Sequence, residues 1–326
     1  DGVLLIDLDS LAVVDSLLLS EVPRCLTISP DSSMLYALTR NYIYRLSTCN
    51  FTLIDSVEVP GGYPEVLAIS PDGHYLFGGG YEIFFVIDTR TQTTIVSTDT
   101  LNIQAMVTDP TEPVVYGSRH HVDLTCSGRE IFRFDTRTMS FNRIYARENV
   151  FECHDIHPTD IQVTSDGIHL LFPSYERDCS LESTGLGRGN VLHHLDLVSG
   201  ELLAETCLDA SYAYLAVTAD NQYAYITDAG HRISLEIFPS GILRRYHLLT
   251  LSVDDFIDFS QFDLTLSDGS PPLEYIALLP DKSTAVISSE VRGADIMIVD
   301  LTAQTLVSKI DLGKKRIMAI CLGPGL

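Results

Sequence analysis

Short apolar runs separated by turn-forming residues recur along the whole chain, and residues 62–96 show the unit most plainly. Its breaks are Pro71-Asp72-Gly73, Gly78-Gly79-Gly80 and Asp88-Thr89-Arg90-Thr91. Proline, glycine, aspartate and threonine favour turns for steric and hydrogen-bonding reasons. The apolar runs are too short for helices and rich in β-branched and aromatic residues, which favours strands. The pattern therefore predicts strands at 66–70, 75–79, 82–88 and 93–96.

The same four-strand unit recurs along the chain. A first strand with its turn, as in CLTISPD and VLAISPD, is found seven times, and a third strand of the type FFVIDTRT is also found seven times, once as SLEIFPSG at 234–241. Consecutive copies lie roughly forty residues apart, or further where insertions lengthen a unit. The repeat predicts an all-β fold, a seven-bladed β-propeller of four-stranded antiparallel blades, as a single domain over residues 1–326.

The two ends of the chain each supply part of one unit. Residues 1–20 contain only a third and a fourth strand, and residues 317–322 contain only a first strand. We therefore predict that the last blade is shared between the N- and C-terminal strands, which would leave no free sheet edge. A second strand is missing from this blade, so either the blade has three strands or the chain continues past Leu326. We favour continuation and therefore expect the chain to belong to a longer polypeptide.

The strings SPDG and VIDTRTQTTIV resemble the repeat of YVTN-type, lactonase-like seven-bladed β-propellers. This resemblance extends over essentially the whole chain, although no literal YVTN string occurs; the nearest strings are LYALT at 35–39 and AYITD at 224–228. The group includes surface-layer and periplasmic propellers, lactonases and propeller subunits of amine dehydrogenases. The resemblance implies the fold, and as one class of function a lactonase-like enzyme or an amine-dehydrogenase-type subunit with a metal or partner at one face.

The charge balance narrows the class of partner. The chain has 44 acidic and 21 basic residues and a net charge of −23. Nucleic-acid binding needs clustered lysine and arginine, so we expect no nucleic-acid partner. Strong negative charge also disfavours an anionic membrane surface, and no apolar run is long enough to predict membrane insertion.

The insertions that lengthen some units are all predicted on one face. In a propeller, the connections from strand two to strand three and from strand four to the next blade lie on the same face, here called the top face. The insertions 117–130, 147–160, 174–190 and 252–272 all fall in such connections, mainly of blades three to five. Long loops on a rigid scaffold commonly carry binding. The predicted ligand-binding residues are His120, His121, Asp123, His154, His157, Glu176, Asp254, Asp255, Phe256 and Asp258.

The segment 252–272 has two interpretations. Its aspartates and phenylalanines would suit an acidic, aromatic contact surface or a calcium-binding loop. Alternatively, Phe256, Phe259 and Phe262 pack the segment down while the acids face water. The second interpretation is favoured, because the aspartate spacing does not match a calcium-binding loop.

Four of the seven cysteines fall in the same zone of the sequence. We expect two disulfides there, each stabilising the fold by about 2–4 kcal/mol. Three pairings are open, and we favour Cys126–Cys179 with Cys153–Cys207 because this joins equivalent loops of neighbouring blades. Cys25, Cys49 and Cys321 would then be free. Disulfides indicate an oxidising location, which is extracellular, on the cell surface or periplasmic.

A bound metal is the main alternative to the disulfides, although no cofactor is predicted. Cys153, His154 and His157, beside the predicted loop that contains His120, would suit zinc or copper. Separately, Glu65, Asp160 and Glu274 lie near the starts of first strands, where a carboxylate ring would bind a cation such as calcium.

Two smaller signals concern single positions. His193 and His194 fall in a third strand, so alternation predicts one buried and one exposed ring. Asn50-Phe51-Thr52 is an N-glycosylation sequon, usable at Asn50 if the chain enters a eukaryotic secretory route.

The sequence supports two classes of function. A regular scaffold with insertions on one side favours a secreted or cell-surface binding module, whose partner is a protein, a glycan or another domain of the same polypeptide. The alternative is the lactonase-like or amine-dehydrogenase-type propeller. No Ser-His-Asp set or acid/base pair can be assigned from spacing, so a non-catalytic role is favoured.

Overall fold

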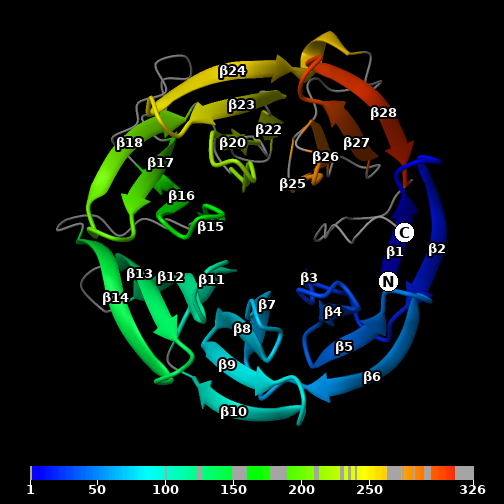
Figure 1. Ribbon diagram of the computed structural model, residues 1–326, viewed down its shortest axis with the longest axis vertical. Coiled ribbons are helices and arrows are strands. Elements are labelled where there is room, and N and C mark those ends of the chain that lie inside the picture. The colour runs from blue at the N-terminus through cyan, green and yellow to red at the C-terminus, as the bar shows by residue number, and fades with distance from the viewer. Residues whose placement is uncertain are drawn as a thin grey trace. The chain divides into compact units, whose positions relative to one another are not determined.

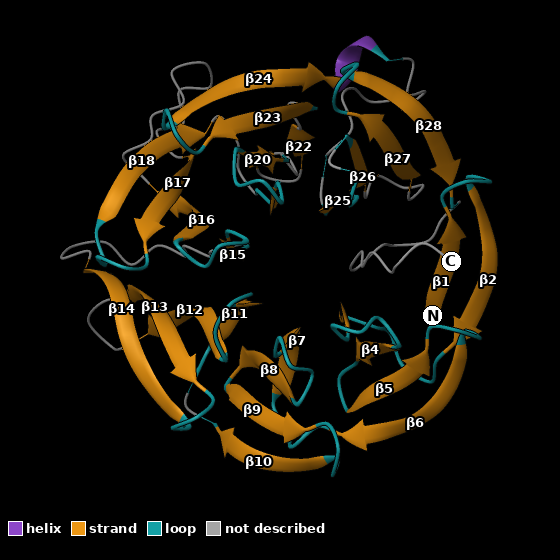
Figure 2. Cartoon of the chain, viewed as in Figure 1, coloured by secondary structure: helices purple, strands orange, loops and turns teal. Residues whose placement is uncertain are grey.

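The computed structural model describes mostly strands and turns, as the repeat predicts (Figure 2). The short helix η1 (Phe259–Gln261) is the one helical element in the described part of the chain. No helix in that part is long and apolar enough to cross a membrane. The described residues are 2–99, 101–122, 127–148, 160–176, 189–208, 213–227, 231–233, 236–238, 241–262, 273, 275–281, 283–289 and 295–312.

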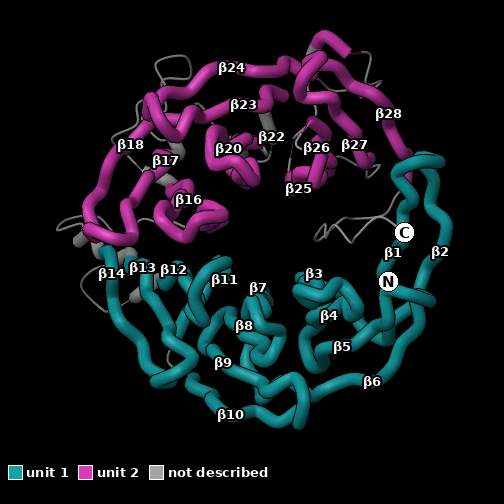
Figure 3. The backbone as a smooth tube through the Cα atoms, in the orientation of Figure 1, with its two compact units in different colours: residues 1–155, 321–326 teal, residues 156–320 magenta. Residues whose placement is uncertain are grey.

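The chain divides into two compact units, residues 1–155 with 321–326 and residues 156–320 (Figure 3). The first unit holds three four-stranded antiparallel sheets and a two-stranded sheet, each with its strands in chain order (Figure 1). The two-stranded sheet is β1 (Gly2–Asp7) and β2 (Ala12–Leu18). Blade one is β3 (Cys25–Ile28), β4 (Met34–Leu38), β5 (Tyr42–Ser47) and β6 (Thr52–Glu58). Blade two is β7 (Tyr63–Ile69), β8 (Tyr75–Tyr81), β9 (Ile83–Asp88) and β10 (Thr93–Thr98), and blade three is β11 (Ile103–Thr108), β12 (Val114–Val122), β13 (Ser127–Asp135) and β14 (Ser140–Glu148).

The second unit also holds three four-stranded antiparallel sheets, with one additional two-stranded ribbon. Blade four is β15 (Gln162–Val163), β16 (His169–Glu176), β17 (Gly189–Asp196) and β18 (Leu202–Leu208). Blade five is β19 (Leu215–Val217), β20 (Tyr223–Ile226), β23 (Ile242–His247) and β24 (Ser252–Asp258). The ribbon is β21 (His231–Ile233) and β22 (Glu236–Phe238), and blade six is β25 (Ile276–Leu278), β26 (Thr284–Ser289), β27 (Asp295–Asp300) and β28 (Thr305–Asp311).

One predicted third strand is wrong. The repeat placed it within residues 234–241, but the strand that pairs with β20 is β23. Residues 236–238 of that range form β22 of the ribbon β21–β22, which is inserted between the second and third strands of blade five. Strand β23 was not predicted because Arg244 and Arg245 in its middle interrupt the apolar run that was used to identify strands.

The six hairpins between a third and a fourth strand and the hairpin β1–β2 share one turn design. A residue in the left-handed conformation, with φ between 48° and 74°, stands at the same place in each. Asp88 accepts hydrogen bonds from the backbone N–H groups of Arg90 and Thr91, and Asp196 and Asp300 do the same in their turns. These carboxylates satisfy turn amides that the strands leave unpaired. The left-handed residues are Leu11, Phe51, Gln92, Met139, Gly200, Leu251 and Gln304.

The number of complete blades differs from the prediction. Six of these hairpins belong to four-stranded sheets, whereas the seventh, β1–β2, has two described strands. The structure therefore describes six four-stranded blades instead of seven. The predicted first strand at 317–322 lies outside the described residues.

The cores lie between consecutive blades within each unit. Phe77 and Phe84 of blade two pack with Phe132 and Phe134 of blade three, and similar clusters join blades one and two, four and five, and five and six. Inner strands are thus buried on both faces, as the continuous burial of β9 shows, while outer strands such as β10 alternate.

The glycine run of blade two was predicted as a break, and this was wrong. Gly78, Gly79 and Gly80 all lie inside β8, and the turn is made by Glu82 at a φ of 53°. A Cβ at Gly78 would lie 1.9 Å from Cζ of Phe85. The run is therefore required for close packing of a buried aromatic ring and not for chain reversal.

Candidate functional site

Three blades carry additions in the same connection, between their second and third strands. In blade two this connection is the single residue Glu82. In blade three, β12 and β13 have nine residues each; in blade four, β16 and β17 have eight each; and in blade five, the ribbon β21–β22 intervenes. The additions in blades three and four lie where the sequence predicts them, whereas the ribbon in blade five was not predicted. The form of the first two differs from the prediction, because most of 117–130 and both ends of 174–190 are strand and not loop.

The blade-three extension carries His120 and His121. Both lie in β12, where His120 is opposite Arg129 and His121 is opposite Gly128. Glu130 anchors the base of the extension, 3.7 Å from Nη1 of Arg119 and 3.4 Å from Nη1 of Arg143.

Much of the predicted site lies outside the described residues. Glu176 ends β16 opposite Gly189. In the part of the chain that the structure describes, no group of three metal-ligating side chains occurs. The zinc or copper site and the carboxylate ring therefore stay predictions. The residues outside the described ranges are Asp123, Cys126, Cys153, His154, His157, Cys179 and Glu274.

The prediction of an inserted loop at 252–272 is wrong for its first part, which is the outer strand β24. Asp254 Oδ2 lies 2.7 Å from Nη2 of Arg245, and Asp255 Oδ1 lies 3.3 Å from Nε of Arg244. Phe256 and Phe259 are buried, which confirms that these phenylalanines pack inward. An outer strand with acids on its exposed positions resembles a loop in sequence, which explains the error. Asp258, also in β24, is exposed.

A ladder of tyrosine, arginine and aspartate crosses alternate blades and was missed in the sequence. Tyr36, Arg45 and Asp55 are consecutive cross-strand partners in blade one. The Arg45 guanidinium makes two hydrogen bonds to Asp55, of 2.7 and 3.0 Å, and a third to the carbonyl of Thr89 in blade two. The ladder therefore ties one blade to the next. The equivalent residues are Tyr225, Arg245 and Asp254 in blade five, and Tyr116, Arg133 and Asn142 in blade three.

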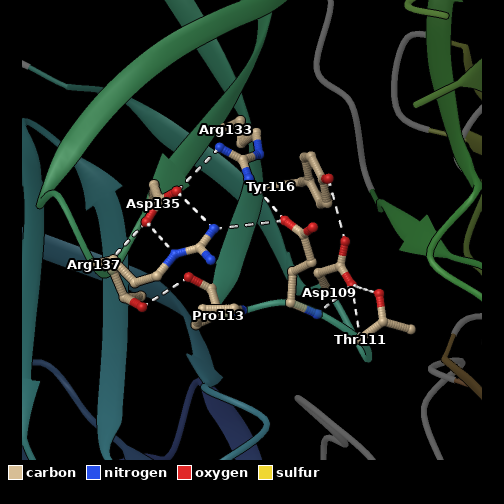
Figure 4. A network of polar contacts seen from close by, with 9 residues as sticks. Asp109, Thr111, Pro113, Tyr116, Arg133, Asp135 and Arg137 are labelled. Atoms are coloured by element: carbon tan, nitrogen blue, oxygen red, sulfur yellow. Dashed lines mark hydrogen bonds and ion pairs between the residues drawn. The ribbon is translucent and has the colours of Figure 1, made fainter. Parts of the chain in front are cut away.

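In blade three the ladder arginine joins a wider charged network (Figure 4). Arg133 lies between Glu112, at 2.9 Å, and Asp135, at 3.4 Å, and Arg137 also contacts Asp135. The hydrogen bond from Arg137 lowers the pKa of Asp135 to about 2. Burial raises the pKa of Tyr116 to about 12, so its phenol stays protonated and donates to a carboxylate.

The carboxylate that accepts from Tyr116 is Asp109, whose other oxygen accepts from the backbone and side chain of Thr111 (Figure 4). Every charged group in this network therefore has an oppositely charged or hydrogen-bonding partner. Such an arrangement holds the turns of blade three in place.

Both histidines of the pair in blade four are buried, so the prediction of one exposed ring is wrong. His193 stacks on Phe172 and its Nε2 is 2.6 Å from Oγ of Ser174. On the other face, Nδ1 of His194 is 3.0 Å from the hydroxyl of Tyr246 in blade five. Alternation places the rings on opposite faces as expected, but both faces of the blade are covered by protein.

Two residues of the proposed carboxylate ring have local partners. Glu65 is exposed in β7 and lies 3.9 Å from Arg24. Asp160 accepts hydrogen bonds from the backbone N–H of Ile161 and from that of Leu215 in blade five. Desolvation raises the pKa of Asp160 to about 6. Its role in the structure is to join the starts of two neighbouring first strands.

The raised pKa of Asp160 predicts that the free energy of unfolding depends on pH. Because the folded-state pKa is about 6 and the ordinary value is 3.8, the stability contribution is present below pH 3.8 and is lost as pH rises through 6. Relative to Asp160→Asn, the native chain should lose about 2 kcal/mol between roughly pH 4 and pH 7.5, after allowing for solvent screening. Urea unfolding at the two pH values measures this. Identical pH slopes for both proteins would contradict it.

The described cysteines are Cys25, Cys49 and Cys207. Cys25 and Cys49 are not disulfide-bonded, as predicted. Cys207 is disulfide-bonded, and its partner is not among the described residues. The pairing of the four cysteines therefore stays a prediction.

The sequon lies at a third-to-fourth-strand turn. Asn50 is exposed, and Thr52 Oγ1 donates a hydrogen bond of 2.8 Å to its Oδ1. Phe51 is buried at the left-handed position of the turn. Glycosylation at Asn50 stays a prediction.

The chain is similar in structure to known proteins across most of its length. For Kuenenia stuttgartiensis hydrazine synthase, the TM-score is 0.72 at 15% sequence identity, over 95% of this chain and 92% of that one. For the β-propeller domain of Myceliophteria thermophila Cps50 (Swd1), the TM-score is 0.68 at 11% sequence identity, and the match covers 93% of this chain and 90% of that domain. No protein-family model and no curated protein matches the chain.

These similarities show the fold alone, because the sequence identities are low. The chain is an all-β propeller built from four-stranded antiparallel blades. Membership of the YVTN-type, lactonase-like group is not confirmed and stays a prediction.

Proposed function

We propose that this chain is a binding module, whose ligand contacts are made by the lengthened second-to-third-strand connections of blades three, four and five. The observation that carries the proposal is the contrast between two kinds of connection. The third-to-fourth-strand turns keep one design in all seven hairpins, whereas three consecutive blades lengthen the other connection. Length variation on one side of a constant frame is typical of surfaces that carry recognition.

The partner that we propose is a protein, a glycan or another domain of the same polypeptide. The net charge of −23 disfavours nucleic acid. An extracellular, cell-surface or periplasmic location belongs to the same proposal and is supported by the disulfide bond of Cys207. A seventh blade that contains β1 and β2 is also part of the proposal, supported by the turn they share with the six complete blades.

Shortening the blade-three extension tests the proposal. Arg119 and Glu130 are cross-strand partners, so an Asn-Gly turn can replace residues 120–129 and leave the Arg119–Glu130 ion pair in place. The native and shortened chains are compared on a glycan array and on a panel of extracellular proteins. We expect a ligand of the native chain to bind the shortened chain at least about tenfold more weakly, with an unchanged circular dichroism spectrum. Equal binding of every ligand would overturn the proposal.

Metal analysis and a thiol count separate this function from an enzyme. Two disulfides would leave three of the seven cysteines free, and metal-free protein with three free thiols agrees with the proposal. Stoichiometric zinc, copper or calcium would favour the catalytic alternative. Six or seven free thiols would remove the argument for an oxidising location.

A further inference from the structure

Blades one and two expose a cluster of tyrosines that the core does not use. Tyr63 and Tyr81 are direct cross-strand partners in β7 and β8, and their exposed fractions are 46% and 57%. Tyr42, at the start of β5, is 37% exposed. By contrast, the tyrosines of the ladders and of the blade interfaces are buried: Tyr36, Tyr44, Tyr116, Tyr225 and Tyr246.

The backbone beneath the exposed rings of Tyr63 and Tyr81 is closely packed. Gly62, directly before Tyr63, has a φ of +71°, and a Cβ there would lie 2.7 Å from Cβ of Ile83. A Cβ at Gly80, directly before Tyr81, would lie 1.9 Å from the carbonyl oxygen of Tyr63. The two strands therefore approach closely where the tyrosines stand. Rigid aromatic side chains on fixed backbone lose little conformational entropy on binding.

One ring already binds a guanidinium group. Cζ of Arg40 lies 4.6 Å from the ring centroid of Tyr63, and its Nη2 donates a 3.1 Å hydrogen bond to the Tyr63 hydroxyl. This is a cation–π contact in an exposed setting. It shows that the electrostatics and geometry at Tyr63 suit a planar cation.

Two carboxylates are neighbours of these tyrosines on the strands. Glu58 is opposite Tyr42 across β5 and β6, and Glu82 follows Tyr81 at the turn. Both are exposed, and neither forms an ion pair within the described residues. In a chain of net charge −23, aromatic faces beside unpaired carboxylates are complementary to a cation.

We propose that this cluster, Tyr42, Tyr63 and Tyr81 with Glu58 and Glu82, binds an arginine- or lysine-bearing segment of a partner protein. The side-chain cations of the segment stack on the exposed rings, and the carboxylates neutralise them. Tyrosine and arginine are enriched at the energetic centres of protein interfaces. The site lies on blades one and two and does not depend on the lengthened connections of blades three to five.

The test compares fluorescence anisotropy of a labelled arginine–glycine peptide on the native chain and on Tyr63→Ala/Tyr81→Ala. The substitutions keep the net charge, so non-specific attraction to the acidic surface is unchanged. We expect binding to weaken about tenfold. Tyr63→Phe/Tyr81→Phe, which keeps both aromatic faces, should bind within about twofold of the native chain, and so should Val307→Ala on the exposed outer strand of blade six.

Other outcomes overturn the proposal. Equal peptide binding by the native and alanine chains would show attraction to net charge alone. If an uncharged oligosaccharide bound the native chain and lost affinity in the alanine variant while the peptide did not, the cluster would be a glycan site. Circular dichroism of both double variants establishes that they are folded. Loss of the lengthened connections should leave peptide binding unchanged, so this test and that of the proposed function fail separately.

Discussion

Replacing Phe84 by alanine is expected to lower the free energy of unfolding by about 4 kcal/mol. The ring is fully buried between blades two and three, at centroid distances of 5.2 Å from Phe134 and 4.9 Å from Phe141. Removing the ring loses the free energy gained by transferring it from water into the core. It also leaves a cavity that the rigid sheets cannot close.

Urea unfolding followed by far-ultraviolet circular dichroism measures this effect, because the chain contains no tryptophan to report it. Val307→Ala is the matched control, since Val307 is an apolar residue exposed on an outer strand, and its effect should stay within about 0.5 kcal/mol. A loss of less than about 1 kcal/mol for Phe84→Ala would mean that blades two and three are not held together by this aromatic cluster.

The second large effect is acid sensitivity at the contact between blades four and five. Burial lowers the pKa of His194 to about 4, from an ordinary value of 6.5, and the neighbouring His169 ring at 4.8 Å adds to the shift. Between pH 4 and pH 6.5, His194 is protonated in the unfolded chain but stays neutral in the folded chain. The stability contribution is therefore present above pH 6.5 and is lost as pH falls to 4, by about 3 kcal/mol.

His194→Phe should remove this acid slope in urea-unfolding experiments. Tyr246→Phe is the control: it deletes the hydrogen bond to Nδ1 but retains the imidazole, so the slope should remain. An acid slope in His194→Phe as steep as that of the native chain would assign the sensitivity to another group. Asp160 acts in the opposite direction over the same pH range, so each variant must be compared with the native chain at every pH.

The architecture of a blade could be predicted from local chemistry. In blade two, the turns at Asp72-Gly73 and at Asp88 were predicted correctly. Aspartate accepts hydrogen bonds from nearby turn N–H groups and glycine allows the turn conformation, and neither property depends on the rest of the fold. Strand β24 was missed because an outer strand is exposed on alternate positions, and acids there look like a loop. Strand β23 was missed because its arginines do not fit an apolar pattern. Arg245 is accommodated in the strand by its ion pair with Asp254, which the sequence pattern does not reveal.

The candidate binding surfaces were predicted less well, since they depend on contacts between residues distant in the sequence. The lengthened connections of blades three and four were found from spacing alone, but their strand character and the ribbon of blade five were not. Tyr63 and Tyr81 become a pair only through the register of β7 and β8, and Arg40 reaches Tyr63 from another blade. Both histidines in blade four are buried because neighbouring sheets cover both faces, which alternation within one strand does not reveal.

The repeated left-handed turn residue implies that this fold is not at its maximum stability. In six of the seven turns that residue is not glycine, and a side chain in this conformation stores strain of about 1 kcal/mol. Gly200 shows that the same turn accepts glycine. Replacing the exposed Gln304 by glycine should therefore release this strain and raise the free energy of unfolding. Gln304 lies far in sequence from both proposed binding surfaces. Leu251 is exposed at the equivalent place, so gains at these two positions would add, whereas the buried side chain of Phe51 would lose its packing.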